Sequence, residues 1–586
     1  MRDVRGNMSD FDTIIRNGTI IDGLRTPKFV GDVGILGGKV ASITGAGGLS
    51  KKTADENVDA TGLVVAPGFV DLHTHFDAQI FWDPYCTIGG WHGVTSVVIG
   101  NCGFGLAPCA PEDRDRAMLA LTRNEAISLP AMQEGLPWDW ETFPEYMDSV
   151  ERTAKGVNVI SYVGLAPIFA KVLGGFDDAK GRRPNKDELE QMKAVISEAM
   201  DAGACGISAQ HLGMNTLQRD YDGTPMITDY MDIDDFCELS TVLKDKGRGA
   251  IQTNGWGPEE CERLCEASGG TLIFNAIALE CDQHGMKADG WRDWISWADD
   301  ANQRGLRVTP QTIITGIDYE FTFEDWNMYD FSPLWRDLCL GSVEERKAKM
   351  ADPSRRQALR DEFDAIKVID ANEMAAATAA VQFNTLDSTS IITVESESLL
   401  DYEGMTIGEI ASKERRHPVD VMLDIAVADD LLTTFATPPN EYNAQDMEVL
   451  LKAKHTLPGM SDGGAHTKFS WLGRYGTEYI VNWVRKHNLV DLEYAHWHLS
   501  AAPASAAGFQ DRGMIKVGSP ADIIVYDFDN LGWTPVTKEY DLPAGDWRRV
   551  SKGVGYHNIM VNGQTTFKDG ECTDRMPGRL LRHGTA

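Results

Sequence analysis

Strand-like apolar runs alternate with helical stretches through the middle of this chain, and that alternation most constrains its fold. The apolar runs occupy residues 63–70, 94–99, 157–163, 203–209, 249–253, 272–278, 306–312 and 457–462. Helical patterns between them include residues 186–202, with Asn185 as an N-terminal cap, and residues 233–245. Alternating strands and helices are typical of parallel βαβ units. Eight strands are the number that closes a barrel, so we predict an α/β protein with a (β/α)8 barrel of the TIM type.

The two ends of the chain have a different texture, with short alternating runs separated by turn residues. Asn-Gly pairs at 17–18 and 562–563 are hairpin signals within such runs. β-rich ends that flank an α/β centre predict one small β-sandwich assembled from both termini. We therefore expect a sandwich domain made of residues 10–64 and 505–575, and a barrel domain over residues 65–504.

The seventh and eighth apolar runs are about 145 residues apart, far more than a βα connection needs. Residues from about 318 to 450 are therefore an insertion. Its opening segment is rich in aromatic residues: Tyr319, Phe321, Phe323, Trp326, Tyr329, Phe331 and Trp335. These rings fit either the insertion's own core or an apolar lid over a pocket at the loop face of the barrel. The residues alone leave both interpretations open.

Side chains of the kind that bind metals follow the first two apolar runs. His73 and His75 close the first run, and residues two apart in a strand share a face, so both imidazoles point the same way. Neutral histidine nitrogen is a favoured zinc ligand. Cys102 follows the second run and offers a thiol that a metal would hold as thiolate. An isolated pair of histidines or a lone cysteine is weak support, since such a cysteine is usually a core residue. Together at strand ends they favour a metal site.

Asp462 ends the eighth run and is followed by two glycines. A carboxylate that touches both a metal and its bound water can accept a proton from the water and return it to a leaving amine. Aspartate before glycine is also common turn chemistry. The position at the end of the last strand favours the catalytic interpretation. His466, four residues later, is a candidate for polarising the substrate or supporting the metal ligands.

Three of these segments resemble the amidohydrolase superfamily, and within it the N-acyl-D-amino-acid deacylase (D-aminoacylase) branch. They are PGFVDLHTH at 67–75, HGVTSVVIGNCGFGLAP at 92–108 and SDGG at 461–464. The resemblance covers nearly the whole chain outside the insertion. It implies that Cys102 takes the metal-bridging place of a carboxylated lysine in other members. It also implies that Asp462 is both metal ligand and proton shuttle, and that the insertion is a mobile flap.

The chain departs from that branch at strands five and six, each of which carries a metal-binding histidine in the branch. Neither predicted strand contains a histidine here, so we expect one Zn²⁺, or one other divalent metal ion, per chain rather than two. The expected metal ligands are His73, His75, Cys102 and Asp462. Side chains expected to contact substrate or to support the ligands are Asn101, Gln252, Asn254, Asn275, His466, Tyr319 and Trp326.

The net charge of −33 argues against nucleic acids and anionic membrane surfaces, because both bind to basic faces. The ten cysteines are scattered, which favours a reducing compartment over a disulfide framework. The N-terminal segment has no apolar signal core, and no run of about 18 apolar residues occurs. We therefore expect a cytoplasmic protein with a small-molecule substrate and no membrane partner. The superfamily resemblance adds a homo-oligomer as an expectation.

Three functions fit these observations. The leading hypothesis is a metal-dependent hydrolase that cleaves the C–N bond of an amide, with a metal-bound hydroxide as nucleophile. Its expected substrate is an N-acyl amino acid or, given the aromatic insertion, a larger apolar amide. The second hypothesis is a metal-dependent non-hydrolytic lyase, decarboxylase or C–C hydrolase on the same fold. The third is a binding protein whose site degenerated with the loss of the two histidines.

Overall fold

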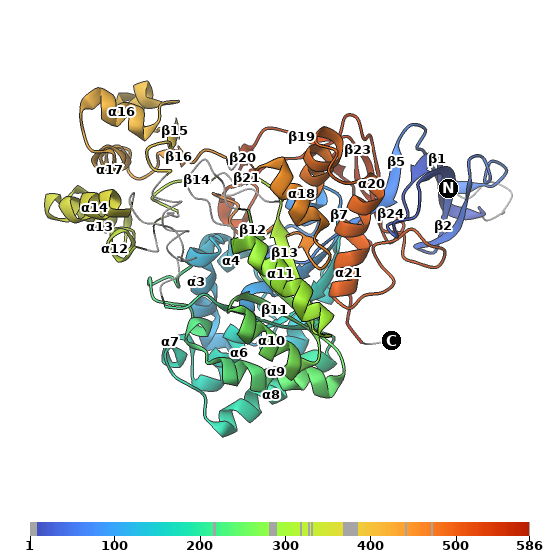
Figure 1. The fold of residues 1–586 in the computed structure, drawn as a ribbon, viewed down its shortest axis with the longest axis horizontal. Helices are drawn as coiled ribbons and strands as arrows, with labels where there is room; N and C mark the ends of the chain where they lie inside the picture. The colour runs from blue at the N-terminus through green and yellow to red at the C-terminus, as the bar shows by residue number, and fades with distance from the viewer. Residues whose placement is uncertain are drawn as a thin grey trace.

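The structure is a computed structural model. It describes residues 9–214, 218–279, 290–316, 319–325, 329, 332–366, 385–439, 442–469 and 473–584. Within these ranges, no helix has both the length and the apolarity needed to cross a bilayer. Figure 1 shows the N-terminal strands at one end of the molecule and the helices of the insertion at the other, with the α/β region between them.

Strands from both ends of the chain form one mixed sheet. Its strands are β1 (Phe11–Ile20), β2 (Phe29–Leu36), β3 (Lys39–Gly45), β4 (Ala54–Asp59), β5 (Val64–Pro67), β18 (Ile523–Tyr526), β23 (Tyr556–Val561), β24 (Gln564–Lys568) and β25 (Glu571–Cys572). β5 pairs antiparallel with β18, and this pairing joins the two ends. Ile15, Val33, Val65 and Ile523 are buried in a shared core. The hydrogen bonds therefore run through a single sheet, whereas the predicted sandwich implies two separate layers.

The apolar run at 63–70, predicted as one strand, is two strands in two different sheets. β5 ends at Pro67, and β6 (Phe69–Asp71) pairs with β7 (Val94–Ile99) instead. Gly68 lies between them, and a Cβ there would lie 2.2 Å from a side-chain carbon of Thr95. Pro67 and Gly68 interrupt the apolar run, but both strands are fully buried, so the run does not show that they belong to different sheets.

The central strands are parallel and lie in two hydrogen-bonded groups. One group is β6, β7 and β8 (Asn158–Ser161); the other is β9 (Val163–Gly164), β10 (Gly206–His211), β11 (Ala250–Gly255), β12 (Thr271–Ala278), β13 (Arg307–Ile313) and β17 (Leu457–Pro458). β8 and β9 are separated only by Tyr162, and Thr74 after β6 forms a parallel bridge to Gly463 after β17. Parallel strands at the predicted places are confirmed. The eighth is shorter than predicted, since the chain turns into a loop at Gly459.

The two helices predicted from the sequence are present as α8 (Lys186–Asp201) and α9 (Ile233–Lys246). The Asn185 side chain accepts hydrogen bonds from the backbone N–H groups of Asp187 and Glu188 and so caps α8, as predicted. Figure 1 shows both helices with α6 (Leu165–Leu173) and α10 (Pro258–Ser268) on one side of the molecule. These helices cover the strands that carry the polar residues described below.

The last residues of the chain leave the terminal sheet and lie along β8. The Val159 N–H donates to the Arg579 carbonyl oxygen (2.9 Å), and the Leu581 N–H donates to the Val159 carbonyl oxygen (2.7 Å). Arg582 donates to the carbonyl oxygen of Ala202, just after α8 (2.8 Å). The C-terminal segment therefore ties the terminal sheet to the central strands.

The residues between β13 and β17 form a substructure with its own core. It contains β14 (Glu320–Phe321), β15 (Ser390–Thr393), β16 (Thr434–Ala436), α12 (Pro333–Leu338), α13 (Val343–Ala351), α14 (Pro353–Ile366), α16 (Ile407–Glu414) and α17 (Pro418–Ala428). The next helix, α18 (Ala444–Lys452), packs instead in the core of the central strands. Phe321, Phe323, Tyr329 and Trp335 are buried in the core of the substructure. For these four rings, the core interpretation is correct and the lid interpretation is wrong. Trp326 and Phe331 lie outside the described residues.

Candidate metal centre

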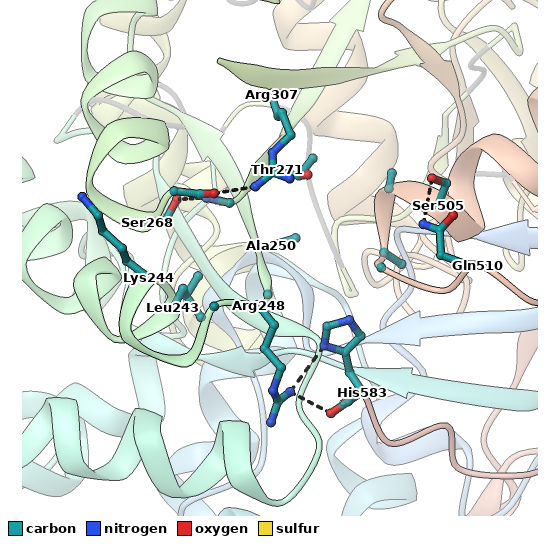
Figure 2. A pocket seen from close by; sticks show the side chains of 17 residues that line it. Leu243, Lys244, Arg248, Ala250, Ser268, Thr271, Arg307, Ser505, Gln510 and His583 are labelled. Atoms are coloured by element: carbon teal, nitrogen blue, oxygen red, sulfur yellow. Dashed lines mark hydrogen bonds between the residues drawn. The ribbon is translucent and has the colours of Figure 1, made fainter. Parts of the chain in front are cut away.

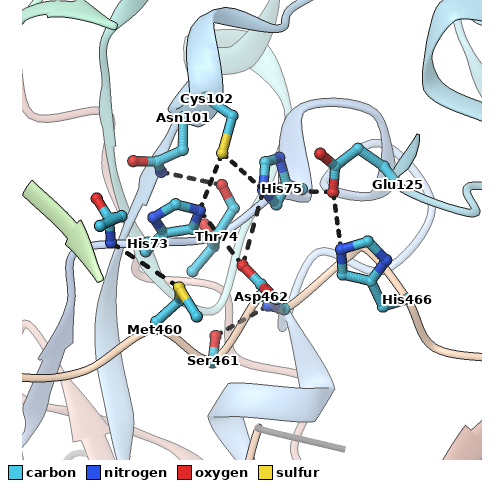
Figure 3. Close-up of polar contacts among 12 residues, drawn as sticks. His73, Thr74, His75, Asn101, Cys102, Glu125, Met460, Ser461, Asp462 and His466 are labelled. Atoms are coloured by element: carbon cyan, nitrogen blue, oxygen red, sulfur yellow. Dashed lines mark hydrogen bonds and ion pairs between the residues drawn. The ribbon is translucent and has the colours of Figure 1, made fainter. Parts of the chain in front are cut away.

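His73 and His75 lie in the loop that follows β6, on either side of Thr74 (Figure 3). The Thr74 hydroxyl donates to the Val98 carbonyl oxygen at 2.7 Å. The Asn101 side chain donates to the carbonyl oxygens of Thr74 (3.1 Å) and Val98 (2.8 Å). These bonds fix the backbone between the two histidines to β7. Asn101, expected near the site, therefore supports this loop through its Nδ2.

Cys102 follows β7 in a tight turn and points toward both histidines. Its Sγ is 3.3 Å from Nε2 of His73 and 3.8 Å from Nε2 of His75. Cys102 has a φ of 58°, so the backbone turns sharply after the strand and aims the sulfur inward. Its side chain is buried. The thiol that the sequence placed at a strand end therefore faces the imidazole pair.

Asp462 completes the group from the loop after β17. Its Oδ1 is 3.3 Å from Nε2 of His73 and 3.8 Å from Nε2 of His75. Gly464 packs directly on the histidine loop, and a Cβ there would lie 2.4 Å from the His75 carbonyl oxygen. Its φ of 96° also favours glycine. The glycines after Asp462 thus let the two loops approach closely enough for the carboxylate to reach both imidazoles.

The spacing of Cys102 and of Asp462 from the two imidazoles fits ligands of one divalent cation. Two ligand atoms about 2.1 Å from a tetrahedral ion lie about 3.4 Å apart, and the sulfur edges are somewhat longer. The measured separations of 3.3 to 3.8 Å match such edges. The donor atoms of His73, His75 and Cys102 all lie within 4.8 Å of one another. Two imidazoles, a thiol and a carboxylate form a donor set suited to zinc.

Burial shifts the pKa values of all four donors. Burial lowers the pKa of His73 to about 4 and also lowers the pKa of His75. Burial raises the pKa of the Cys102 thiol well above its ordinary value and raises that of Asp462. Neutral imidazole is the form that binds metals, and a bound cation converts a thiol to thiolate. A bound cation would therefore supply positive charge beside the thiol and the carboxylate.

The strands β11 and β12, in which the sequence contains no histidine, present amide side chains near Cys102. The Cys102 N–H donates to Oε1 of Gln252 (2.7 Å), and Nδ2 of Asn254 donates to the Cys102 sulfur (3.1 Å). Nε2 of Gln252 donates to Oδ1 of Asn254 (2.6 Å) and of Asn275 (2.9 Å), and Asn275 in turn donates to Gln311 (2.6 Å). Gln252, Asn254 and Asn275 therefore form one hydrogen-bond network that reaches Cys102.

Sequence reasoning missed Glu125, which lies directly after α3 (Arg114–Asn124). Its Oε2 is 3.5 Å from Nε2 of His75 and 3.2 Å from Nε2 of His466. Burial would raise the pKa of Glu125, but the two imidazoles outweigh it and hold the pKa at about 2. Burial would likewise lower the pKa of His466, but Glu125 raises it. The only signal in the sequence is one acidic residue beside the apolar segment AISLP, which is weak.

Of the two aromatic candidates, Tyr319 and Trp326, the structure describes only Tyr319. Tyr319 directly precedes β14 and is half-buried, with its ring stacked on Phe469 at 6.4 Å between centroids. Burial, with a contribution from the charge of Asp462, raises the pKa of Tyr319 to about 12. Trp326 lies outside the described residues.

A cavity of about 330 Å³ lies at the opposite ends of the central strands (Figure 2). Its wall includes Ala250, Thr271 and Arg307, the first residues of β11, β12 and β13. Arg248, also in the wall, donates to the His583 carbonyl oxygen (2.7 Å) and so holds the C-terminal segment. Barrel enzymes carry their chemistry at the carboxyl ends of their strands. This cavity is therefore not a candidate for the active site.

Comparison with known proteins agrees with the geometry. Residues 56–567 match the amidohydrolase family. The chain belongs to this family. This amidohydrolase is accordingly a hydrolase that acts on carbon–nitrogen bonds, and the resemblance to the deacylase branch is confirmed.

This amidohydrolase is similar to curated deacylases along almost its whole length. It is 34% identical to N-acyl-D-aspartate deacylase of Alcaligenes xylosoxydans xylosoxydans, over 98% of this chain and 96% of that protein. It is 24% identical to D-aminoacylase of the same organism, over 98% of both chains.

Two solved structures share the fold of this amidohydrolase. The crystal structure of D-aminoacylase has a TM-score of 0.65 at 21% identity, covering 98% of this chain and 100% of that one. N-acyl-D-glutamate deacylase from Bordetella bronchiseptica, solved with zinc and a phosphonate mimic of the tetrahedral intermediate, has a TM-score of 0.64 at 21% identity. It covers 98% of this chain and 99% of that one. The α/β architecture is therefore that of amidohydrolase-type enzymes.

Proposed function

We propose that this amidohydrolase is a metal-dependent enzyme that cleaves the amide bond of an N-acyl amino acid or of a larger apolar amide. The observation that carries the proposal is the convergence of His73, His75, Cys102 and Asp462 beyond the carboxyl ends of β6, β7 and β17. The names of the deacylase relatives, which describe N-acyl-D-amino-acid substrates, support an amide as the bond that is cleaved.

The architecture that we propose is a closed (β/α)8 barrel with a second domain made from both chain ends and an insertion after β13. The parallel bridge between Thr74 and Gly463 supports closure between the first and last strands. The pairing of β5 with β18 supports the terminal domain. Barrel closure matters for function because it brings the loops after β6 and β17 to the same side of the site.

One Zn²⁺ per chain is the cation that we propose for this site, held by the two imidazoles, the thiolate and Asp462. When bound, it would lower the pKa of a coordinated water and polarise the carbonyl of the scissile amide. A single ion is favoured because Gln252, Asn254 and Asn275 already hydrogen-bond to one another or to Cys102. Amide side chains are also weaker zinc ligands than the histidines of the related branch.

Asp462 is the proposed proton shuttle. Its carboxylate would accept a proton from the attacking water and deliver it to the nitrogen of the leaving amine. The oxygen of the water then remains on the acyl carbon as the C–N bond breaks. Asp462 suits this task because its side chain is 15% exposed, whereas that of His73 is 1% exposed. Substrate and solvent can therefore reach the carboxylate.

Metal analysis of the purified enzyme tests the centre. We expect about one zinc per chain in the wild type and a large loss of metal in the His73→Ala variant, because that imidazole contacts both the thiol and the carboxylate. A fully active wild-type enzyme without bound metal would contradict the proposal.

Isotope labelling tests the reaction itself. Turnover of an N-acyl amino acid in oxygen-18 water should place one labelled oxygen in the released carboxylate, as amide hydrolysis requires. Products without the label would point instead to a lyase or a decarboxylase on the same fold.

A further inference from the structure

The Glu125 side chain is 1% exposed and has an unusual environment. Within the described residues, neither of its carboxylate oxygens accepts a hydrogen bond from a backbone amide or a hydroxyl group. The polar atoms that face it are two imidazole nitrogens, Nε2 of His75 at 3.5 Å and Nε2 of His466 at 3.2 Å. A buried carboxylate that can accept a hydrogen bond from only one imidazole is costly unless a positive charge also lies against it. The surroundings of Glu125 therefore indicate a cation.

The contact with His75 has the geometry of two ligands on one ion. The same Nε2 atom of His75 also faces Cys102 at 3.8 Å and Asp462 at 3.8 Å. A ring nitrogen that binds a metal carries no proton, so it cannot donate to Glu125. The separation of 3.5 Å then corresponds to the edge of about 3.4 Å that joins two ligand atoms on one cation.

The contact with His466 holds the carboxylate in place. The two loops are joined by a hydrogen bond from the His466 N–H to the Glu125 carbonyl oxygen (2.7 Å). The His466 ring packs on Phe469 at 4.8 Å between centroids, and Phe469 and Ala126 both belong to the core of the insertion. Carboxylates that bind metals are commonly oriented by a hydrogen-bond donor behind them. His466 can supply that donor through its Nε2–H.

Building on the proposed metal centre, we propose that Glu125 is a fifth ligand of the cation, through Oε2, and that His466 is the residue that positions it. The carboxylate restores one of the donors lost with the histidines of strands five and six. It comes from the loop after α3, so the chain supplies the missing ligand from a different element.

Cobalt substitution of the full-length protein tests this proposal without relying on activity. The visible spectrum of bound Co²⁺ reports the number and type of ligands, and competition with a chelator gives its affinity. We expect Glu125→Gln to change the spectrum and to weaken Co²⁺ binding about 10- to 100-fold. Asp77→Asn is the matched control, because Asp77 is another buried carboxyl group near the centre that faces the backbone N–H of Gly100. Its spectrum and affinity should equal those of the wild type.

Two substitutions of His466 test whether this residue positions Glu125. His466→Gln keeps an N–H donor and should retain most of the Co²⁺ affinity, whereas His466→Leu should lower it. Equal affinities for these two variants would contradict the positioning role.

The outcomes also separate this inference from the proposed function. If Glu125→Gln binds Co²⁺ with wild-type spectrum and affinity while His73→Ala loses it, the centre stands and Glu125 is not a ligand. If the wild type binds no Co²⁺, both proposals fail.

Discussion

Three side chains of the site come from residues with unusual backbone conformations. Cys102, Asp462 and His466 have φ values of 58°, 49° and 55°. Positive φ in a residue other than glycine is uncommon and costs on the order of 1 kcal/mol. Each of the three lies in a loop after a strand, where a sharp turn directs the side chain toward the centre. The strain is offset by the packing of the loops against one another.

Replacement of Asp462 by asparagine tests the proton shuttle. Asparagine keeps the size of the side chain but cannot accept a proton at neutral pH. We expect kcat to fall about 10²- to 10⁴-fold while the circular dichroism spectrum stays unchanged. An Asp462→Asn variant with near-normal kcat would assign the shuttle to another group.

Replacement of Asn254 by leucine tests the support of the cysteine. Nδ2 of Asn254 donates to the Cys102 sulfur at 3.1 Å, and leucine removes this donor at similar volume. We expect metal affinity to fall about 10-fold or more, because partners behind a ligand contribute at this level. Chelator competition measures the change. An Asn254→Gln variant keeps an amide donor and is the control, and equal losses in both variants would indicate a packing effect.

At the level of elements, the sequence predicted strand order and ligand type because both leave local patterns. Buried strands give continuous apolar runs, and residues at their ends are visible as polar interruptions, as at His73 and Asp462. Glu125 left no such pattern, because its reach to His75 depends on the path of the loop after α3. Pro67 and Gly68 mark an interruption in the run at 63–70, but the change of sheet there was not visible, since the strands on both sides are apolar. Contacts between loops, and the passage of the chain from one sheet to another, depend on the tertiary fold and leave no local pattern in the sequence.

Lys155, just after α5 (Phe143–Arg152), makes the free energy of unfolding of the protein depend on pH. Its ammonium group donates to the Glu151 carbonyl oxygen at 3.2 Å, yet burial lowers its pKa from 10.5 to about 8. Between pH 8 and 10.5 the unfolded chain binds more protons at this site than the folded protein does, so stability rises with pH in that window.

A Lys155→Met variant should lose this rise. We expect it to be more stable than the wild type below pH 8, by about 1–2 kcal/mol after allowing for nearby water, and to converge with it toward pH 10.5. Denaturant unfolding at a series of pH values measures the difference. Lys186→Met, at an exposed lysine, is the control and should leave the pH dependence unchanged.

At the level of the whole molecule, segments far apart in sequence hold the central strands. β5 pairs with β18, and residues 579–581 pair with Val159 on β8. The insertion meets the site through Ala126 and Phe469, which neighbour Glu125 and His466. Composition and motifs predicted that both ends contribute to one unit. They gave no indication that the final residues return to the central strands.

A truncated chain that ends at Met576 tests whether the pairing of residues 579–581 with Val159 stabilises β8. It lacks the two backbone hydrogen bonds to Val159 and the ion pairs of Arg582 with Asp148 and Glu151. Each backbone bond contributes about 1 kcal/mol, so we expect a lower unfolding temperature and faster hydrogen exchange in β8. Arg582→Ala in the full chain separates the ion pairs from the backbone bonds. Unchanged exchange in β8 would show that the pairing adds no protection.

The pairing of β5 with β18 has a consequence for biosynthesis. β5 leads directly into β6 and the two histidines, and its partner β18 begins only at Ile523. During translation, the N-terminal ligand pair therefore leaves the ribosome long before the strand that anchors it exists. Asp462 also emerges late, so a nascent chain cannot assemble a working centre until nearly all of the polypeptide has been made.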